Sequence, residues 1–227
     1  MPQGSQYYAE KLSAERLRKC YDLAPPRVRQ YLETEIRHVL SRIHASDVVL
    51  ELGCGYGRVL QELAPRAGTT IGIDNSLSNL RLARETGKTA RSCRLLLMDA
   101  GALSFRPNVF DVLVGIQNGI SAFKVEPHRL LRESLRVTKP GGLILLSSYA
   151  EAFWDARMEW FGLQAKHGLV GEIDRDRTGN GVIVCRDGFR ATTFTPGDFR
   201  ELCTSVGVQC EICEVDHSSV FCEIRVE

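Results

Sequence analysis

The sequence predicts an α/β fold built on a doubly wound, mostly parallel sheet of seven strands. From residue 47 onward, short apolar runs of strand length alternate with helical patterns. This order produces parallel strands with right-handed crossovers and helices on both faces of the sheet. The first run, residues 48–52, is apolar except at Glu51, as expected of a strand buried on both sides. Two strand-like runs around a short polar turn close the chain and predict a C-terminal antiparallel hairpin.

Proline, glycine and capping residues separate these elements. Pro65 ends a short helix that begins at Gly57, and Ser76 can cap a helix that Gly87 stops. Pro140 and the two glycines after it turn the chain into the fifth strand. We expect strands over residues 48–52, 69–73, 93–98, 110–116, 143–147, 208–215 and 220–226, with a helix over 196–206 before the last two.

Two further segments accompany the sheet. Residues 1–46 carry two amphipathic helical patterns and are expected to form an N-terminal helical cap on the main domain, residues 47–227. Residues 149–195 interrupt the alternation with an aromatic helix and a hairpin, whose strands are expected at 170–173 and 182–185 around a turn at 178–181. An insertion at the ligand-binding edge predicts a lid or substrate platform. The alternative is a segment that only covers apolar surface.

Composition limits the possible partners. The 227 residues carry a formal net charge of +1, with 44% hydrophobic and 25% charged residues, so no overall field favours nucleic acid or an anionic membrane. No apolar run approaches the roughly 20 residues that span a bilayer, and residues 1–10 lack the apolar stretch of a secretory signal. We therefore expect a cytoplasmic protein that binds a small molecule in a pocket, with eight reduced cysteines. The sequence leaves its oligomeric state open.

Four late cysteines raise the question of a metal site. Cys203, Cys210, Cys213 and Cys222 include one C-x-x-C spacing. Zinc knuckles place such pairs on tight turns and normally use two of them. Here the second pair is missing and the spacing falls on a predicted strand, so we predict no metal.

A glycine-rich turn carries the main functional signal. Gly53, Gly55 and Gly57 directly follow the first predicted strand. Glycine admits positive φ and close approach of a ligand to the backbone, and the helix start beyond offers unpaired N–H groups. In an open α/β sheet, ligands bind at this edge. Asp74 ends the second predicted strand and is placed to accept hydrogen bonds from ribose hydroxyls.

The glycine spacing argues against a dinucleotide. The dinucleotide fingerprint needs a third glycine at position 58 to seat the helix near the pyrophosphate, but that position is Arg58. Glu51, two residues before Gly53, would repel a pyrophosphate and would tolerate a ligand that carries an amino group.

At these residues the sequence resembles the class I S-adenosylmethionine-dependent methyltransferases, over residues 47–226. Residues 51–57 are similar to that family's first motif, and residues 71–74 to its second, whose acidic residue binds the ribose. Met98, Asp99 and Ala100 resemble the third, where the carboxylate faces the adenine amino group. Residues 110–114 and 135–142 resemble the fourth strand and the helix, turn and strand that follow. The resemblance implies a Rossmann-like fold with S-adenosylmethionine as cofactor.

The resemblance also implies the reaction and the residues that hold the cofactor. The sulfonium methyl group passes to a small-molecule N, O or S nucleophile by in-line displacement, which leaves S-adenosylhomocysteine. Orientation and exclusion of water supply most of the rate gain in such a reaction. The implied cofactor-binding residues are Glu51, Gly53, Cys54, Gly55, Gly57, Asp74, Asn75, Asp99, Ala100, Ile116 and Gln117.

The segment after the fourth strand, residues 115–123, bears on the acceptor. It lacks the Asn/Asp-Pro-Pro-Tyr/Phe signature with which related enzymes hold a planar amide or base nitrogen, which argues against adenine-N6 or glutamine methylation. It is more similar to the Asn-x-x-x-His type of stretch in small-molecule methyltransferases, with Phe123 replacing the histidine, so no catalytic base is assigned. The candidate substrate contacts are Tyr8, Asn118, Phe123, Tyr149 and Trp154, and the alternative for each aromatic ring is a place in the core.

Three alternatives stay open. An RNA or protein substrate would need a local basic patch, but a solvated helix face explains the arginines and lysine of residues 81–94 more simply. A soft acceptor such as arsenite would need a thiolate triad, which the cysteine spacing does not show. A methyltransferase-like module could bind the cofactor or a partner without turnover, although the intact cofactor motifs argue against it.

Overall fold

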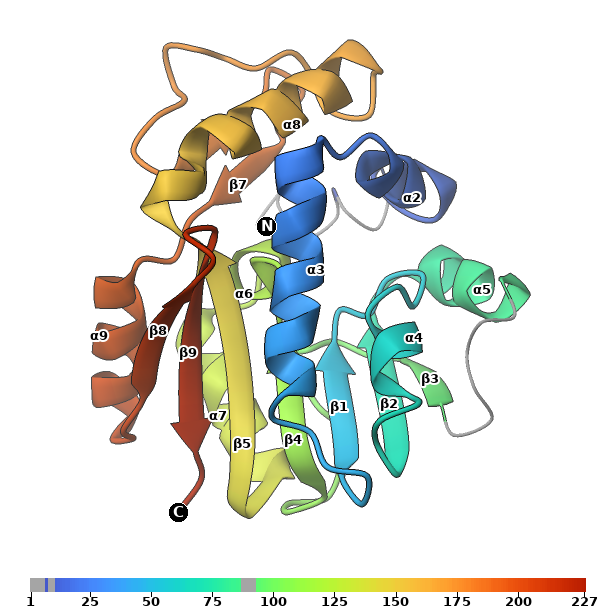
Figure 1. Cartoon of the computed structure of the whole chain (residues 1–227), viewed down its shortest axis with the longest axis vertical. Helices are drawn as coiled ribbons and strands as arrows, with labels where there is room; N and C mark the ends of the chain where they lie inside the picture. Colours follow the sequence, from blue (N-terminus) through green and yellow to red (C-terminus); the bar gives the residue numbers. More distant parts are fainter. Residues whose placement is uncertain (1–6, 8–10, 87–92) are drawn as a thin grey trace.

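The computed structural model describes residue 7 and residues 11–86 and 93–227. Within these residues, a seven-stranded sheet has the order β3-β2-β1-β4-β5-β9-β8 (Figure 1). Strands β1 to β5 pair in parallel, whereas β9 pairs antiparallel with both β5 and β8. The doubly wound, mostly parallel sheet with a C-terminal antiparallel hairpin is confirmed. Its strands are β1 (Val48–Leu52), β2 (Thr69–Asp74), β3 (Cys93–Leu97), β4 (Phe110–Gly115), β5 (Thr138–Tyr149), β8 (Glu211–Val215) and β9 (Ser219–Arg225).

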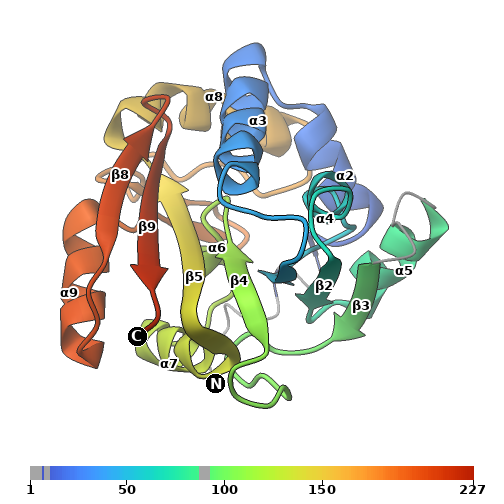
Figure 2. The ribbon, with the colours of Figure 1, turned by 60° about the horizontal axis from the view of Figure 1, so that its bottom comes forward.

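Helices cover both faces of this sheet (Figures 1 and 2). Ser76 caps its helix as the sequence predicts, because its side chain accepts a hydrogen bond from the Asn79 N–H. Thr195 and Asp198 form a capping box at the start of the last helix. Gly207 then ends the last helix in the left-handed conformation, with φ of 78°. The helices are α2 (Glu15–Asp22), α3 (Pro26–Leu40), α4 (Leu60–Leu63), α5 (Leu77–Glu85), α6 (Gly119–Ala122), α7 (Pro127–Val137), α8 (Trp154–Lys166) and α9 (Pro196–Val206).

Alternating side chains of the strands pack into one apolar core on each face of the sheet. Val49 and Val112 belong to the core that includes residues of α3 and α4. Leu50 and Leu113 belong to the other, which includes residues of α7 and α9. Because side chains two apart in a strand share a face, Glu51 lies on the α3 and α4 side with Val49. A carboxylate therefore enters an apolar face at the end of β1.

Three sequence-based boundaries were wrong. The strand expected over residues 208–215 begins only at Glu211. The helix expected over residues 57–64 is only the four-residue α4, because the glycine turn extends to Gly57, whose N–H bonds to the Cys54 carbonyl at 2.9 Å. The fifth strand, expected at residues 143–147, spans Thr138–Tyr149. Its register with β4 shifts between Phe110 and Val112, so the strand runs through the Pro-Gly-Gly turn as an irregularity instead of starting after it.

The insertion carries a two-stranded sheet, but not the hairpin that the sequence predicts. β6 (Val182–Val184) pairs with β7 (Arg190–Thr192), whereas residues 170–173 contribute only a single bridge, from Ile173 to Cys185. The turn at Gly179–Val182 does form. The tighter reversal lies at residues 186–188, where the Gly188 N–H bonds to the Cys185 carbonyl at 3.1 Å and Gly188 has φ of 94°. This is the pattern of a three-residue hairpin loop that ends in a left-handed glycine.

The insertion and the N-terminal helices lie together beyond the carboxyl ends of the parallel strands (Figure 1). The short 3₁₀ helix η1 (Glu151–Phe153) leads from β5 into α8, and the Trp160 indole N–H donates to the carbonyl of Cys20 at 2.8 Å. The aromatic helix therefore closes over the sheet edge against α2 and α3. In the described ranges, no helix combines the length and apolar character needed to cross a membrane.

Candidate active site

The glycine turn after β1 adopts the conformation that its sequence predicts. Gly53, Gly55 and Gly57 have φ of 64°, 55° and 84°, values at which a Cβ atom is strained. The Cys54 N–H bonds to the Ile73 carbonyl at 2.9 Å, which fixes the turn to the end of β2. An added Cβ on Gly53 would come within 2.3 Å of the Phe123 ring. Glycine is therefore required at this position both by its φ and by the close approach of Phe123.

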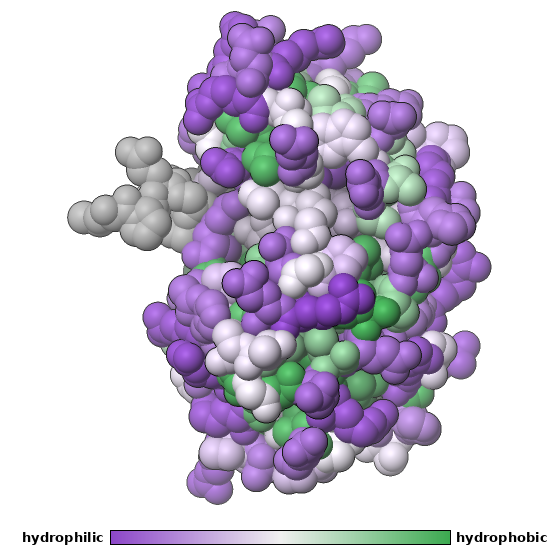
Figure 3. Space-filling view, turned by 90° about the vertical axis from the view of Figure 1, so that its left-hand side faces the viewer, coloured by the Kyte–Doolittle hydropathy of each residue, from purple (hydrophilic) through white to green (hydrophobic). Residues whose placement is uncertain are grey.

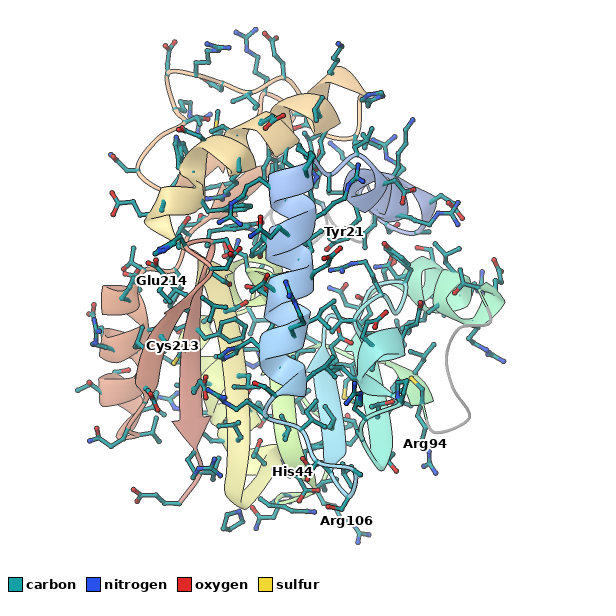
Figure 4. All side chains as sticks on the ribbon, in the orientation of Figure 1. Tyr21, His44, Arg94, Arg106, Cys213 and Glu214 are labelled. Carbon is teal, nitrogen blue, oxygen red and sulfur yellow. The ribbon has the colours of Figure 1, made fainter. Side chains whose placement is uncertain are left out.

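A cavity opens between this turn, the ends of β2 and β3, and the segment that follows β4. It encloses about 1050 Å³, including the part that is open to solvent. Tyr21 lines it from the α2 side, and Figure 4 shows this residue beneath α2, toward the ends of the strands. All predicted cofactor-binding residues except Gly57 line the cavity: Glu51, Gly53, Cys54, Gly55, Asp74, Asn75, Asp99, Ala100, Ile116 and Gln117.

Two carboxylates stand at neighbouring strand ends in this cavity. Asp74 Oδ2 accepts from the Gly55 N–H at 2.9 Å, and its Oδ1 accepts from the Ser76 N–H at 2.8 Å and from Asn79 Nδ2 at 3.1 Å. Since a carboxylate accepts about four hydrogen bonds, one site remains on Asp74. Asp99 is exposed, and among the described residues its side chain accepts only the Gly101 N–H, at 2.7 Å to Oδ1, so Oδ2 is left for a ligand.

Glu51 is the most deeply buried acidic residue that lines this cavity. Its side chain is 4% exposed, and Oε2 has no hydrogen-bond partner among the described residues. Burial raises the pKa of Glu51 to about 8, against the opposing influence of the Arg58 guanidinium. An acceptor without a donor is costly to bury, so this oxygen marks a place where a cationic or hydrogen-bonding ligand group would be stabilised.

Comparisons with known proteins agree with this geometry. Residues 49–142 match the family model described as a methyltransferase domain. The chain is 31% identical over 130 residues to malonyl-[acyl-carrier protein] O-methyltransferase of Marinomonas sp., covering 55% of this chain and 46% of that protein. Together these likenesses support a class I S-adenosylmethionine-dependent methyltransferase domain in this chain.

Two further likenesses place this methyltransferase domain. A 2-methyl-6-phytyl-1,4-hydroquinone methyltransferase of Synechocystis sp. is 28% identical over 139 residues, which cover 55% of this chain and 42% of that protein. The chain thus spans less than half the length of the curated relatives it matches. The structure of an N-methyltransferase of Bradyrhizobium japonicum, in complex with S-adenosylhomocysteine, has a TM-score of 0.62 at 16% identity and covers 98% of both chains. This second likeness shows the shared fold.

A second cavity of the methyltransferase domain adjoins the first. It encloses about 520 Å³, including its open part, between α2, α3 and α8. Two buried polar atoms in lining residues, the Tyr31 hydroxyl and Gln117 Nε2, have no hydrogen-bond partner among the described residues. The two cavities share five lining residues: Leu12, Leu17, Tyr21, Gln117 and Ala122.

Glu35 is a site residue that sequence reasoning missed. It lies on α3, is fully buried, and its Oε2 accepts the Gln117 N–H at 2.8 Å, while the Ser219 hydroxyl donates to Oε1. Gln117 and Asn118 both have positive φ, 58° and 60°, so Glu35 holds a strained segment between the cavities. Burial raises the pKa of Glu35 to about 7. The available signal was an acidic residue on the apolar stripe of the second predicted helix.

The candidate substrate residues of the methyltransferase domain are scattered. Tyr149 lines the second cavity and Phe123 the first. Asn118 lines neither, because its Oδ1 accepts from the Ser148 hydroxyl at 2.8 Å in the buried interior. Trp154 also lines neither cavity and packs against the apolar cluster of the insertion. Tyr8 lies outside the described residues.

Proposed function

We propose that this chain is an enzyme that transfers a methyl group from S-adenosylmethionine to a small neutral acceptor. The observation that carries the proposal is the adjacency of two cavities, one lined by the glycine turn and its acidic neighbours, the other lined mainly by aromatic side chains. Gln117 and Tyr21 line both cavities, so a methyl group held between these cavities could be approached by a cofactor in the first and an acceptor in the second. In-line displacement needs the donor sulfur and the acceptor atom on opposite sides of the methyl group.

The first cavity fits S-adenosylmethionine. Glu51 Oε2, buried and without a partner among the described residues, suits the ammonium of the methionine part, since a charge-assisted hydrogen bond stabilises both groups. Asp74 keeps one acceptor site for the ribose hydroxyls, and the free oxygen of Asp99 suits the adenine amino group. The glycine turn lets the cofactor approach the backbone, because no Cβ stands in the way.

The bound cofactor supplies an electrophilic methyl group whose departure neutralises the sulfonium. The chain's own contribution is orientation and exclusion of water, which give large effective concentrations in well-aligned reactions. Glu35 orients Gln117 at the boundary through the Gln117 N–H, so we assign Glu35 a positioning role. Trp160 and Tyr21 pack together, with ring centroids 5.9 Å apart, and shield the boundary from solvent.

The second cavity favours a planar, weakly polar acceptor. Tyr149, Trp160 and Phe161 supply aromatic surface, while the Tyr31 hydroxyl and Gln117 Nε2 can donate to an acceptor oxygen. A phenol or enol oxygen satisfies both features. The hydroquinone methyltransferase among the relatives supports an acceptor of this kind.

Methyl transfer to a panel of phenols, hydroxyquinones, amines and thiols, followed with isotope-labelled S-adenosylmethionine, tests the proposal. We expect turnover with a planar hydroxylated compound, and Y31F should raise its KM about 2- to 13-fold, the effect of one hydrogen bond of 0.5–1.5 kcal/mol. The control is T70V, which removes a buried hydroxyl from β2 that lines neither cavity. Cofactor binding without transfer to any acceptor class would instead support a non-catalytic module.

A further inference from the structure

Three of the four late cysteines meet at one point of the fold. Cys203 lies on α9, Cys210 just before β8 and Cys222 on β9, and their three sulfur atoms lie within 4.8 Å of one another. The Sγ atoms of Cys203 and Cys222 are 3.7 Å apart. None of the three residues lines either cavity of the methyltransferase domain, so the proposed reaction gives this cluster no role.

The chain path explains why the C-x-x-C spacing is not the relevant pair. Gly207 turns the chain after α9, and the Val208 N–H bonds to the Cys203 carbonyl at 3.0 Å, which brings Cys210 back beside Cys203. Residues three apart along an extended segment face opposite sides of a sheet. Accordingly, Cys213, labelled on β8 in Figure 4, points away from the cluster and approaches Glu223 Oε1 at 3.5 Å.

The surroundings of the three thiols suit a soft metal ion. Cys203 and Cys222 are 1% and 0% exposed, whereas Cys210 is half-buried. Figure 1 shows α9 and β8 on its left-hand side, and Figure 3 shows that hydrophilic residues cover most of that side of the molecule. The cluster belongs to the apolar core on the α9 face, and sulfur ligands without oxygen ligands select zinc-like or copper-like ions over magnesium or calcium.

We propose that Cys203, Cys210 and Cys222 bind one divalent thiophilic ion of the zinc class as three thiolates. Tetrahedral ligands at a Zn–S distance of about 2.3 Å lie roughly 3.8 Å apart, so the spacing of Cys203 and Cys222 needs almost no adjustment. Among the residues that the structure describes, no fourth protein ligand joins the group, and water at the half-buried Cys210 side completes the coordination. Three thiolates with a divalent ion retain one negative charge, and a monovalent ion would leave two, which burial disfavours.

Such an ion would tie α9 to β8 and β9. Each thiol loses its proton on binding, so uptake releases up to three protons and strengthens as pH rises. Because the ion binds only the folded chain, it should raise the midpoint of thermal unfolding. The effect is structural and is expected with or without a methyl acceptor.

Metal titration of the fully reduced, metal-free chain tests the site. We expect one Zn²⁺ per chain by elemental analysis, and Cd²⁺ used as a probe should give a thiolate-to-metal charge-transfer absorption. C210S should weaken Zn²⁺ binding by more than about 100-fold, since loss even of an outer-shell partner costs 10- to 100-fold. The matched control is C93S, a half-buried cysteine of β3 that belongs to no group of possible metal ligands among the described residues, and this variant should bind as the unaltered chain does.

C210S is the diagnostic variant because Cys210 is half-buried, so its replacement disturbs the core less than replacement of Cys203 or Cys222 would. Circular dichroism should show that the variant is folded. A reduced chain that takes up no Zn²⁺ or Cd²⁺ overturns the proposal. Equal losses in C210S and C93S also overturn it, because they point to adventitious thiol binding. A chain that forms only a Cys203–Cys222 disulfide on oxidation, without prior metal uptake, contradicts it as well.

Discussion

Among the residues that the structure describes, Glu51 carries the one buried carboxylate oxygen in the lining of the cofactor cavity that has no partner, and replacing Glu51 with glutamine removes it. A charge-assisted hydrogen bond contributes about 1.5–3 kcal/mol, but Glu51 must first ionise. With a pKa of about 8, ionisation costs about 2.7 kcal/mol near pH 6 and only about 0.4 kcal/mol near pH 8. E51Q should therefore bind S-adenosylmethionine almost as the unaltered chain does near pH 6. Near pH 8 it should bind about 6- to 80-fold more weakly.

The affinity for the cofactor should increase with pH because the pKa of Glu51 is raised. The pKa of Glu51 is raised by burial, so the protonated form predominates below about pH 8, and binding of an ammonium group releases this proton. The affinity of the unaltered chain should rise more than about tenfold between about pH 6 and about pH 8, and this rise should be absent in E51Q. S-adenosylhomocysteine carries the same ammonium and should respond in the same way.

Isothermal titration calorimetry in buffers of different ionisation enthalpy measures both the affinity and the released proton. The control is E62Q, which neutralises an exposed carboxylate on α4 and should leave both quantities unchanged. Equal affinities for E51Q and the unaltered chain near pH 8 would refute the assignment of Glu51 to the ammonium.

Three further predictions concern the turn, the buried glutamate of α3 and the cap of α9. G53A should weaken cofactor binding and lower the free energy of unfolding, because its Cβ would meet Phe123 at 2.3 Å. The control is G141A, whose Cβ at φ of 77° would meet nothing within 4 Å, so it should show only the backbone strain of about 1 kcal/mol. Equal losses of unfolding free energy in the two variants would contradict the clash. Burial raises the pKa of Glu35 to about 7, so the stability linked to its protonation is present at low pH and lost as pH rises from about 4.5 through 7. E35Q should flatten the plot of unfolding free energy, measured in urea, against pH over this range. An unchanged slope of that plot would contradict the burial. T195A should lower the free energy of unfolding by about 1 kcal/mol through loss of the capping box, which urea denaturation can detect, whereas an unchanged midpoint would show that the cap contributes nothing.

Local patterns predicted the parts of the fold that depend on local chemistry. The alternation of apolar runs placed every strand of the parallel sheet, and Ser76 caps the start of its helix as predicted. The glycine turn and the acidic ends of β2 and β3 were located because their spacing is fixed by the strands that carry them. Recognition of the methyltransferase family from these motifs is confirmed by the match over residues 49–142.

Long-range pairing was not predictable from the same patterns. Glu35 reaches the Gln117 N–H across 82 positions of sequence, and no local rule sets that contact. The partner of β6 was misassigned because residues 170–173 and 190–192 both have strand-like character, and only the turn at Gly188 decides between them. Cys203, Cys210 and Cys222 converge through a helix, a turn and a strand, so their spacing in the sequence hid the cluster.

The shape of the second cavity, the proposed acceptor site, depends most on such long-range contacts. Tyr31, which lies on α3, and Tyr149 at the end of β5 form one wall of the second cavity, with ring centroids 5.5 Å apart. Their approach depends on how the N-terminal helices pack over the insertion. The acceptor class is therefore a proposal from the cavity and not from any motif.

A crystal structure of the chain with S-adenosylhomocysteine would test directly whether the cofactor lies in the first cavity with its sulfur toward the second. We expect the ammonium within hydrogen-bond distance of Glu51 Oε2, the ribose at Asp74 and the adenine amino group at Asp99. The sulfur should be directed toward Gln117 and the second cavity. A ligand bound elsewhere would contradict it. So would a ligand in this cavity whose sulfur faces away from Gln117, because the acceptor cavity could not then receive the methyl group.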